Sequence, residues 1–518
     1  MPGLDGVLRE RALANPDRVA YIAGDQEITY RDFDRRVDRV AVALSAAGVG
    51  PGDRVAILDK NSLEYAELLF GAARIGAAQV PVNYRLAPDE VAYIVNNAQA
   101  KVFVVGPEFV PVLDAIAGKL EHTAHTAVID PPGPAYQDYT AWIDAAPDST
   151  SEYEPDTGDV FVQLYSSGTT GLPKGVMLTH DNFLASLSAT NDKWGIEESS
   201  ILMVAMPMYH VAGNVLTISV IYNGLTGVLT REPDPTAIAR GIERHRVTHI
   251  FLVPVLLQFM PLIPEVTACD LSSLRLMLYG ASPISEDVLR GAMAMLPDAG
   301  FMQVYGLTEV TGAITMLPAE DHDPDGPDAH RLRSAGLPNP TTTLKIVDPG
   351  TQEEVPAGQV GEILCRTPQN MKGYWGMPEA TATALSADNW FRTGDAGYLD
   401  EDGYLYIHDR VKDMIISGGE NIYPAEVENV LMGHPDVGDC AVIGVPDEKW
   451  GETPKAIVVA SGDVTDQEII DYCRERLAHF KCPTTVERRA EIPRNPTGKI
   501  LKRELRAPYW QGKDRAVH

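Results

Sequence analysis

The sequence predicts an α/β protein with a large N-terminal domain, made of two α/β layers plus a small β-barrel, and a small C-terminal α+β domain. The chain has 518 residues, whereas one hydrophobic core rarely supports more than about 250 to 300. Strand-like and helix-like runs alternate through residues 19–304, as in parallel α/β layers. After Ser334, short strands separated by glycine and proline replace this alternation. We therefore assign residues 1–410 to the large domain and residues 411–518 to the small one.

The first α/β layer is expected to begin with helices at 5–15 and 30–47, with a strand pair at 19–22 and 27–29 between them. The second helix carries Asp32 in its first turn, where a carboxylate complements the positive end of the helix dipole. The layer then alternates strands at 54–58, 78–82 and 101–105 with helices at 62–75 and 87–98. This pattern is typical of a parallel sheet and is compatible with many chemistries.

The second layer repeats the alternation. Strand-like segments at 160–164 and 176–179 flank residues 165–175. After them, strands are expected at 201–206, 247–253, 275–279 and 300–304, and helices at 181–194, from 214, at 255–262 and at 285–296. Strands at 342–347, 361–366 and 404–408 predict the small β-barrel or sheet. Beyond residue 411, the segments 425–433, 439–444, 455–459 and 465–477 alternate helix and strand character, which predicts a compact domain of about a hundred residues.

Composition narrows the range of partners. A formal net charge of -29 disfavours nucleic acids and anionic membrane surfaces. The chain has no run of about 18 apolar residues, so we expect no integral membrane association, and its acidic first residues do not resemble a signal peptide. A cytoplasmic protein is expected, and a homodimer is compatible with the sequence. Five widely spaced cysteines, without a C-x-x-C pair, predict reduced and mostly structural thiols.

The run Y-S-S-G-T-T-G-L-P-K-G at 165–175 predicts a grip for phosphate groups. Its glycines let the backbone approach a ligand, its hydroxyls donate hydrogen bonds, and its lysine adds a mobile charge. The residues that we expect to bind are Ser166, Ser167, Gly168, Thr169, Thr170, Gly171 and Lys174. A P-loop has different spacing, because its lysine directly follows a glycine and precedes a helix. A flexible surface turn is the structural alternative.

Three further motifs carry candidate chemistry. Glu309 ends the run Q-V-Y-G-L-T-E, and a carboxylate near a triphosphate is unfavourable unless it holds a divalent cation, so we expect a Mg²⁺ ligand. Asp395 ends W-F-R-T-G-D, and a carboxylate suits the two hydroxyls of a ribose. Lys499 lies at the tip of P-R-N-P-T-G-K. Taken singly, each residue has a structural alternative: a helix cap, a turn aspartate and a solvated loop lysine.

Together, these motifs resemble the AMP-forming adenylate enzymes, the superfamily of acyl-CoA synthetases, luciferases and peptide-synthetase adenylation domains. At least five motifs match in the expected order, over nearly the whole chain. The resemblance implies ATP, Mg²⁺ and CoA as ligands. It places Thr308 on phosphate, packs Tyr305 and Gly306 along the adenine, and adds Gly280, Ala281 and Ser282 to the nucleotide site.

The same resemblance assigns roles in the C-terminal part. Asp395 and Arg410, with Ile407 nearby, would bind the ribose and phosphate. Lys412 falls at the hinge of a mobile small domain. The backbone at Gly418 and Gly419 would lie beside the pantetheine arm of CoA, and Lys499 would steady the carboxylate and the α-phosphate during adenylation. Because these groups serve different half-reactions, rotation about Lys412 would let each visit the site.

For the acyl group, the resemblance points to the residues Met206, Tyr209, His210, Gly213, Asn214, Tyr279, Gly280 and Gly306. Amino-acid-activating domains usually have an aspartate after the aromatic residue of the first segment, but here Tyr209 and His210 stand there, which favours a neutral tail. His210 is interpreted as an aromatic gate or a carboxylate neighbour, with a buried structural histidine as the alternative. The glycines at 213 and 280 suggest room for a medium- or long-chain fatty acid, or for a bulky cyclic or aryl acid.

The function expected from this resemblance is an AMP-forming acyl-CoA ligase, an acid–thiol ligase of fatty acid metabolism. One alternative is an acyl-AMP ligase that loads a carrier protein, which the lack of a long insertion near 350–383 disfavours. A luciferase-like oxygenase shares every motif. A nucleotide-binding sensor without activity is disfavoured by the joint presence of Glu309, Asp395 and Lys499.

Overall fold

The structure, a computed structural model, describes residues 2–147, 153–166, 172–418, 420–461, 464–494 and 500–511. The chain folds into two compact units. The first comprises Met1–Thr343 and Cys365–Phe391, and the second comprises Leu344–Leu364 and Arg392–His518.

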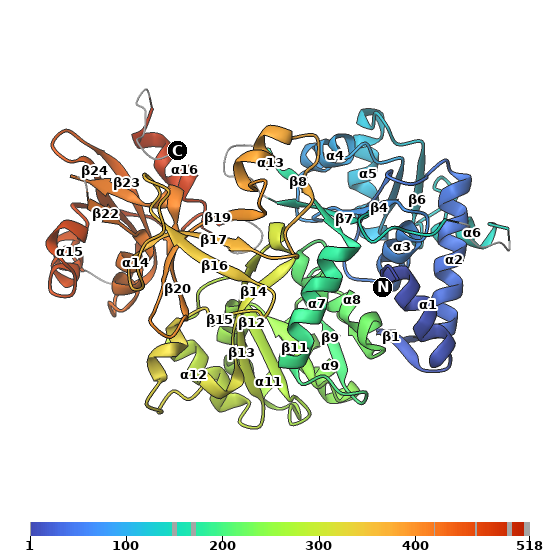
Figure 1. Ribbon diagram of the computed structural model, residues 1–518, viewed down its shortest axis with the longest axis horizontal. Coiled ribbons are helices and arrows are strands. Elements are labelled where there is room, and N and C mark those ends of the chain that lie inside the picture. The colour runs from blue at the N-terminus through green and yellow to red at the C-terminus, as the bar shows by residue number, and fades with distance from the viewer. Residues whose placement is uncertain are drawn as a thin grey trace. The chain divides into compact units, whose positions relative to one another are not determined.

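The first unit contains a nine-stranded sheet (Figure 1). Its central strands pair in parallel, and antiparallel strands close both edges. In spatial order the strands are β15 (Leu337–Pro338), β14 (Gly312–Leu317), β13 (Gly300–Leu307), β12 (Leu276–Gly280), β11 (His249–Leu252), β9 (Ile201–Val204), β10 (Thr226–Leu229), β1 (Val19–Ala23) and β2 (Gln26–Thr29).

A seven-stranded sheet forms the other layer of the first unit. Its strands are β18 (Gly373–Tyr374), β8 (Lys174–Thr179), β7 (Val160–Ser166), β4 (Ala78–Pro81), β3 (Arg54–Leu58), β5 (Val102–Val105) and β6 (His125–Val128). The four strands β4, β3, β5 and β6 are parallel to one another and to β7, whereas β8 runs antiparallel to both β7 and β18.

Helices cover and separate the two sheets. They are α1 (Leu4–Ala14), α2 (Tyr30–Ala46), α3 (Leu63–Ala73), α4 (Pro88–Asn97), α5 (Val110–Ile116), α6 (Tyr139–Asp144), α7 (His180–Trp194), α8 (Val211–Asn223), α9 (Pro235–His245), α10 (Pro254–Phe259), α11 (Pro264–Thr267), α12 (Glu286–Met295) and α13 (Pro378–Ala384). Side-chain caps fix several starts. Thr29, for example, accepts a hydrogen bond from the backbone N–H of Asp32 at the start of α2.

A chain of buried aromatic rings forms part of the core of the first unit. The rings meet edge to face, with centroids 5.1 to 5.9 Å apart, the arrangement that aromatic quadrupoles prefer. The chain runs from β1 of one sheet through α2 and α3 to β7 of the other and ends on α7; its members are Tyr21, Phe33, Phe70, Phe161 and Phe183. Helix α7 contacts β8 and β14, one strand from each sheet. The two layers are thereby joined through shared helices.

The second unit contains two sheets. Strands β16 (Thr343–Val347), β17 (Gly361–Arg366), β19 (Trp390–Leu399) and β20 (Leu405–Arg410) form the first, and β17 and β19 run across the boundary between the units. Strands β22 (Glu420–Ile422), β21 (Ile415–Ser417), β24 (Gly451–Ala460) and β23 (Val437–Asp447) form the second, with β25 (Thr485–Arg488) paired to β24. The helices are α14 (Pro424–Met432), α15 (Asp466–Arg474) and α16 (Lys502–Arg506).

The predicted fold class is confirmed, since two α/β layers are followed by small sheets and an α+β region. Where a small barrel was expected, the described residues form a four-stranded sheet whose outer strands β16 and β20 do not pair with each other. No helix in the described part of the chain is both long and apolar enough to cross a bilayer.

The cysteines are all free thiols. Cys365, Cys440, Cys473 and Cys482 are buried, and burial raises the pKa of both Cys365 and Cys473 to about 12. Cys269, which follows α11, is partly exposed. The four buried thiols are therefore packed, protonated and structural, as predicted.

Candidate active site

The predicted phosphate-binding stretch is a β-hairpin. Strands β7 and β8 are antiparallel, and Ser166 lies opposite Lys174 in their register. A strand therefore follows the loop, which agrees with the prediction that this is not a P-loop. Ser167, Gly168, Thr169, Thr170 and Gly171 lie outside the described residues.

The hairpin meets the predicted metal ligand. Glu309 lies in a single 3₁₀ turn, Thr308–Val310, that directly follows β13. Its Oε1 accepts a hydrogen bond from the hydroxyl of Ser166 at 3.1 Å and a second from the hydroxyl of Tyr374 at 3.2 Å. The structure thus brings together two motifs that are 143 positions apart in sequence.

The turn that carries Thr308 and Glu309 is held where the backbone at Gly306 closely approaches the backbone at Gly312. A Cβ on Gly306 would lie 1.6 Å from the carbonyl oxygen of Gly312, so only glycine fits at this point of the β13–β14 hairpin. Thr311, which ends the turn, has a φ of 53°, unusual for a β-branched residue, and its hydroxyl donates to the carbonyl of Gln369 at 2.7 Å. Strained backbone of this kind is frequent at functional sites.

A second strained turn follows β12. Ala281 has a φ of 67°, and both Ala281 and Ser282 are exposed. Gly280 approaches β13 so closely that a Cβ would lie 2.2 Å from the carbonyl oxygen of Val304. The neighbouring Tyr279 is fully buried, and its hydroxyl bonds Nε2 of His322 at 2.9 Å. Its ring is therefore fixed from the core side of the sheet.

The predicted acyl segment connects β9 to α8 and is held by Asn61. The amide group of Asn61 donates to the carbonyl of Met206 at 3.0 Å and to that of Thr230 at 3.0 Å, and its oxygen accepts from the N–H of Met208 at 2.8 Å. Buried backbone groups need such partners. Asn61 is 4% exposed and follows β3, so it links the seven-stranded sheet to the acyl segment of the other sheet.

Two predicted acyl-site residues, Asn214 and Gly213, have structural roles in this segment. The buried amide of Asn214 donates to the backbone carbonyl of Met208. A Cβ on Gly213 would lie 2.3 Å from the carbonyl oxygen of Pro207. From the sequence, the glycines at 213 and 280 suggest open space, but the structure gives both a backbone-packing reason. They therefore do not measure the width of an acyl pocket.

His210 is a neutral aromatic neighbour. Its ring centroid lies 4.3 Å from that of Tyr209, which in turn meets Tyr84 edge to face at 5.3 Å. Burial, aided by the positive charge of Arg85, lowers the pKa of His210 to about 4. The imidazole is uncharged at neutral pH, so it suits an aromatic wall or a hydrogen-bonding group and does not supply a cation for a carboxylate.

These residues collect along one edge of the nine-stranded sheet. Met206, Tyr209 and His210 follow the carboxyl end of β9, Gly280 to Ser282 end or follow β12, and Tyr305 to Glu309 end or follow β13. The strands lie in the order β13, β12, β11, β9 and are parallel. Ligands of open α/β sheets bind outside the carboxyl ends of the strands.

In the second unit, the predicted ribose contacts are neighbours. Asp395 on β19 and Arg410 on β20 are cross-strand partners, and Nε of Arg410 lies 2.8 Å from Oδ1 of Asp395. Arg410 also donates to the carbonyl of Thr393 at 3.2 Å. Ile407, on the same strand, is 37% exposed.

The predicted hinge residue, Lys412, lies in the 3₁₀ turn Val411–Asp413. Helix α16 holds this turn through Arg506, which donates to the carbonyl of Lys412 at 3.3 Å and pairs with Asp413 at 2.8 Å. The buried Lys502 pairs with Glu428 at 2.9 Å and with Asp409 at 3.4 Å. Burial alone would lower the pKa of Lys502, but the two carboxylates outweigh it and raise the pKa.

Gly418 has a φ of 60°, and its N–H donates to the carbonyl of Trp450 at 2.8 Å. A Cβ at this position would lie 2.7 Å from the Trp450 ring, so glycine is required here. Gly419 and Lys499 lie outside the described residues.

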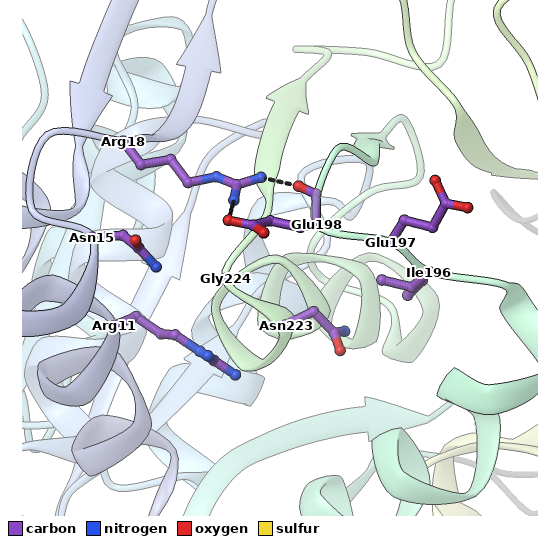
Figure 2. A pocket seen from close by; sticks show the side chains of 8 residues that line it. All are labelled: Arg11, Asn15, Arg18, Ile196, Glu197, Glu198, Asn223 and Gly224. Carbon is purple, nitrogen blue, oxygen red and sulfur yellow. Dashed lines mark hydrogen bonds and ion pairs between the residues drawn. The ribbon is translucent and has the colours of Figure 1, made fainter.

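A cavity of about 310 Å³ lies elsewhere in the first unit and contains none of the predicted site residues. Figure 2 shows Arg18 bonded to Glu198 within it, and Glu197 pairs with Arg275. The lining residues are Arg11, Asn15, Arg18, Ile196, Glu197, Glu198, Asn223 and Gly224. With two arginines and two glutamates, the lining has no excess positive charge for a polyphosphate.

Two family models of known proteins match this chain. Residues 8–375 match the family model of AMP-binding enzymes, and residues 426–499 match that of the AMP-binding enzyme C-terminal domain. The chain belongs to the AMP-binding enzyme family. The resemblance noted in the sequence is thereby confirmed at the level of the superfamily.

Relatives in this family cover nearly the whole chain. The fatty acid–[acyl-carrier-protein] ligase ScoC of Streptomyces coeruleorubidus is 40% identical, over 97% of this chain and 96% of its own length. The long-chain-fatty-acid–CoA ligase FadD13 of Mycobacterium tuberculosis is 39% identical, over 98% of this chain and 99% of its own length. The crystal structure of ATP-bound MatB from Rhodopseudomonas palustris is similar to this structure, with a TM-score of 0.88 and 31% sequence identity. The match covers 98% of this chain and 99% of the MatB chain.

The described residues are chemically compatible with a Mg²⁺ ion that is bound together with the phosphates of a nucleotide. They contain no group of three or more histidine, cysteine, aspartate or glutamate side chains that could hold a metal alone. Mg²⁺ is commonly bound by one or two carboxylates together with substrate phosphates. Glu309, bonded to the hairpin predicted to bind phosphate, offers one such carboxylate.

Two residues of this site, Tyr374 and Asn61, are not recognisable from the sequence alone. Tyr374 bonds Glu309, and the ammonium of Lys174 lies 4.9 Å from the centroid of its ring. Burial and the charge of Glu309 raise the pKa of Tyr374, so its hydroxyl stays a donor. Neither residue belongs to a motif with diagnostic spacing, and both act on partners far away in sequence.

Proposed function

We propose that the protein is an AMP-forming acyl-CoA ligase. A carboxylate oxygen of the acid attacks the α-phosphorus of ATP, and the bond to pyrophosphate breaks. The thiol sulfur of CoA then attacks the acyl carbon, the bond to AMP breaks, and the thiol proton leaves to solvent. The observation that carries this proposal is the contact between Ser166 and Glu309, which joins the phosphate hairpin to the candidate metal ligand at the carboxyl edge of the sheet.

In the adenylation step, the hairpin and the β13 turn handle the phosphates. Thr308 donates a hydrogen bond and Lys174 supplies positive charge, while the hydroxyl of Ser166, which donates to Glu309, ties the hairpin to the metal ligand. Mg²⁺ held at Glu309 would neutralise the phosphate oxygens. Ser167, Gly168, Thr169, Thr170 and Gly171 stay predicted phosphate contacts, and Tyr305 with Gly306 and the 280–282 turn stays the predicted adenine side.

The second unit supplies the remaining groups. The adjacent Asp395 and Arg410 suit a ribose and its phosphate, because one accepts and the other donates hydrogen bonds. Lys499 is the proposed charge on the carboxylate and the α-phosphate. The backbone at Gly418 and Gly419 is the proposed edge for the pantetheine arm, and rotation about Lys412 alternates these roles.

The acid that we propose is apolar, either a medium- to long-chain fatty acid or a bulky cyclic or aryl acid. A neutral His210 beside Tyr209 offers no charge for a polar tail. Two relatives agree with this range by name: FadD13, and the feruloyl-CoA synthase of an Amycolatopsis species, which is 40% identical over 96% of this chain.

A second candidate is transfer of the acyl group to a carrier protein, as the name of ScoC states for that relative. Both candidates share the adenylation step and differ only in the thiol that accepts the acyl group. A luciferase-like oxygenase would instead need oxygen as the second substrate.

The experiment is pyrophosphate release and thioester formation across acids from acetate to palmitate, with benzoate and a steroid acid. Each acid is tested alone, with CoA, and with a pantetheine-bearing carrier protein. We expect multiple turnovers with CoA and a maximum for one class of apolar acid. Multiple turnovers with the carrier protein alone would favour the second candidate, and no acid-dependent pyrophosphate release would overturn both.

Three wider predictions accompany this proposal. The boundary between a large domain, 1–410, and a mobile small domain, 411–518, a cytoplasmic location and a homodimer all stay predictions. Gel filtration with light scattering tests the last of these.

A further inference from the structure

We propose that Tyr374 is a positioning residue: it aims the carboxylate of Glu309 at Mg²⁺ and keeps the ammonium of Lys174 away from that carboxylate. This inference rests on the proposed function, because it assigns the metal to Glu309. Tyr374 itself is not placed on the nucleotide or on the acid.

The backbone around Tyr374 is tied to both partners. The N–H of Met371 donates to the carbonyl of Glu309 at 2.8 Å, and the N–H of Trp375 donates to that of Gly175 at 2.7 Å, beside Lys174. Between them, Tyr374 pairs with Val176 in the β18–β8 ladder. The segment 371–375 therefore straps the metal-ligand turn to the return strand of the phosphate hairpin.

The side chain acts on the carboxylate through one oxygen. The hydroxyls of Tyr374 and Ser166 both donate to Oε1 of Glu309, at 3.2 and 3.1 Å. Two donors on the same oxygen fix the rotation of the carboxylate plane. Among the described residues no hydrogen bond or ion pair is made to Oε2, so that oxygen is left to face a cation. Hydrogen bonds to a charged group are the stronger ones.

The ring acts on the lysine. The ammonium of Lys174 lies over the aromatic face, 4.9 Å from its centroid, within the range of a cation–π contact. In the described structure, Lys174 and Glu309 form no direct ion pair, although both contact the same tyrosine. Were the two to pair, the lysine would compete with Mg²⁺ for the carboxylate. Tyr374 thus leaves the ammonium of Lys174 available to phosphate and the carboxylate of Glu309 available to the metal.

The test is Tyr374→Phe, which removes only the hydroxyl. The matched control is Tyr93→Phe, because the hydroxyl of Tyr93 donates to the carbonyl of Pro173 at 3.3 Å, in the same hairpin but away from Glu309. Binding of Mn²⁺ is measured by electron paramagnetic resonance with a non-hydrolysable ATP analogue present. The Mg²⁺ concentration for half-maximal pyrophosphate release is measured in parallel.

We expect Tyr374→Phe to weaken Mn²⁺ binding and to raise the Mg²⁺ requirement, each by about tenfold, which is the size of one hydrogen bond to a charged group. The KM for the acid should stay within about twofold, and Tyr93→Phe should match the wild type in both metal measurements. A merely structural role would instead change the KM for the acid and the melting temperature without a selective effect on metal.

A second variant, Tyr374→Leu, removes the ring as well and should raise the Mg²⁺ requirement further, because the cation–π contact that holds the Lys174 ammonium is lost. Wild-type Mn²⁺ affinity in a folded Tyr374→Phe would overturn the inference. Failure of the proposed function is distinguishable, since it would appear as a lack of acid-dependent pyrophosphate release in the wild type, whereas Mn²⁺ binding needs no turnover.

Discussion

His180 shows at the scale of one residue how burial fixes a protonation state. Its side chain is fully buried at the start of α7, and its Nδ1 accepts a hydrogen bond from the backbone N–H of Leu4 at 3.1 Å. Burial outweighs the nearby charges of Asp159 and Asp181 and lowers the pKa of His180 to about 4. The imidazole must be neutral to accept this bond, so the attachment of α1 depends on pH.

We predict that His180 makes the protein less stable in acid. The unfolded histidine has a pKa of about 6.5, so between pH 6.5 and 4 the unfolded state binds more protons than the folded one. The contribution of His180 to the free energy of unfolding is therefore fully present above about pH 6.5. It is lost as the pH falls towards 4, and the total loss is about 3 kcal/mol. Urea unfolding at several pH values measures this dependence.

The control for this prediction is His180→Gln, whose amide oxygen accepts from Leu4 without titrating. The wild type should lose stability more steeply than the variant between pH 6.5 and 4.5. Parallel curves for the two proteins would contradict the assignment of this slope to His180.

Candidate residues such as Ser166, Glu309, Asp395 and Arg410 could be proposed from sequence because their types and spacings are specific, and their roles stay predictions. Tyr374 and Asn61 could not, since their partners lie 65 and 147 positions away and only the fold brings them together. At positions 213 and 280 glycine is required by close backbone contact, which no sequence pattern shows.

At the scale of elements, hydrophobic periodicity located most of the helices and the long parallel strands. It did not locate several elements, among them the helix α9 and the four-residue strand β10. Short apolar runs such as that of β10 do not distinguish strand from helix. Closure of the expected barrel depends on pairing between strands far apart in the chain, and in the described residues β16 and β20 do not pair.

Two helical glycines provide a matched prediction at this scale. Gly213 in α8 would place a Cβ 2.3 Å from the carbonyl oxygen of Pro207, whereas a Cβ on Gly291 in α12 would meet nothing within 4 Å. We expect Gly213→Ala to destabilise the protein by about 1 to 3 kcal/mol through a forced backbone shift, and Gly291→Ala to stabilise it by about 0.5 to 1 kcal/mol through helix propensity.

Thermal and urea unfolding of the two variants decide this prediction. A Gly213→Ala variant as stable as Gly291→Ala would show that the acyl segment relaxes freely. The same backbone shift in Gly213→Ala should also raise the KM for the acid, because it displaces Pro207, which lies in the acyl segment between Met206 and Tyr209.

At the scale of the whole molecule, the charge pattern places constraints on function. A net charge of -29 repels ATP and CoA at long range, so local cations must outweigh it where these ligands bind. Lys174 in the first unit and Arg410 in the second are the candidates. Each lies beside a polar partner, Tyr374 and Asp395 respectively, that fixes its position.

The hinge proposal predicts separable half-reactions. Proline fixes φ near -65°, a value that suits the 3₁₀ turn around Lys412 and forbids a large change there. Lys412→Pro should therefore lower thioester formation by about a hundredfold or more and leave single-turnover adenylation within about threefold. Rapid-quench assays of pyrophosphate and thioester measure the two steps separately.

Lys412→Ala is the control for the hinge, because it removes the side chain but keeps φ free, and it should retain both steps. Equal loss of adenylation and thioester formation in Lys412→Pro would refute rotation about this residue. The bond from Arg506 to the Lys412 carbonyl would survive either substitution, since it uses only the backbone.

The uneven burial of the five cysteines has a practical consequence for studying that rotation. Four thiols are packed in the interior, whereas Cys269 is partly exposed. A maleimide dye should therefore attach at one place on the unaltered chain. With a second dye on a cysteine introduced beyond Lys412, single-molecule energy transfer could follow the proposed rotation during turnover, and no native thiol would have to be removed.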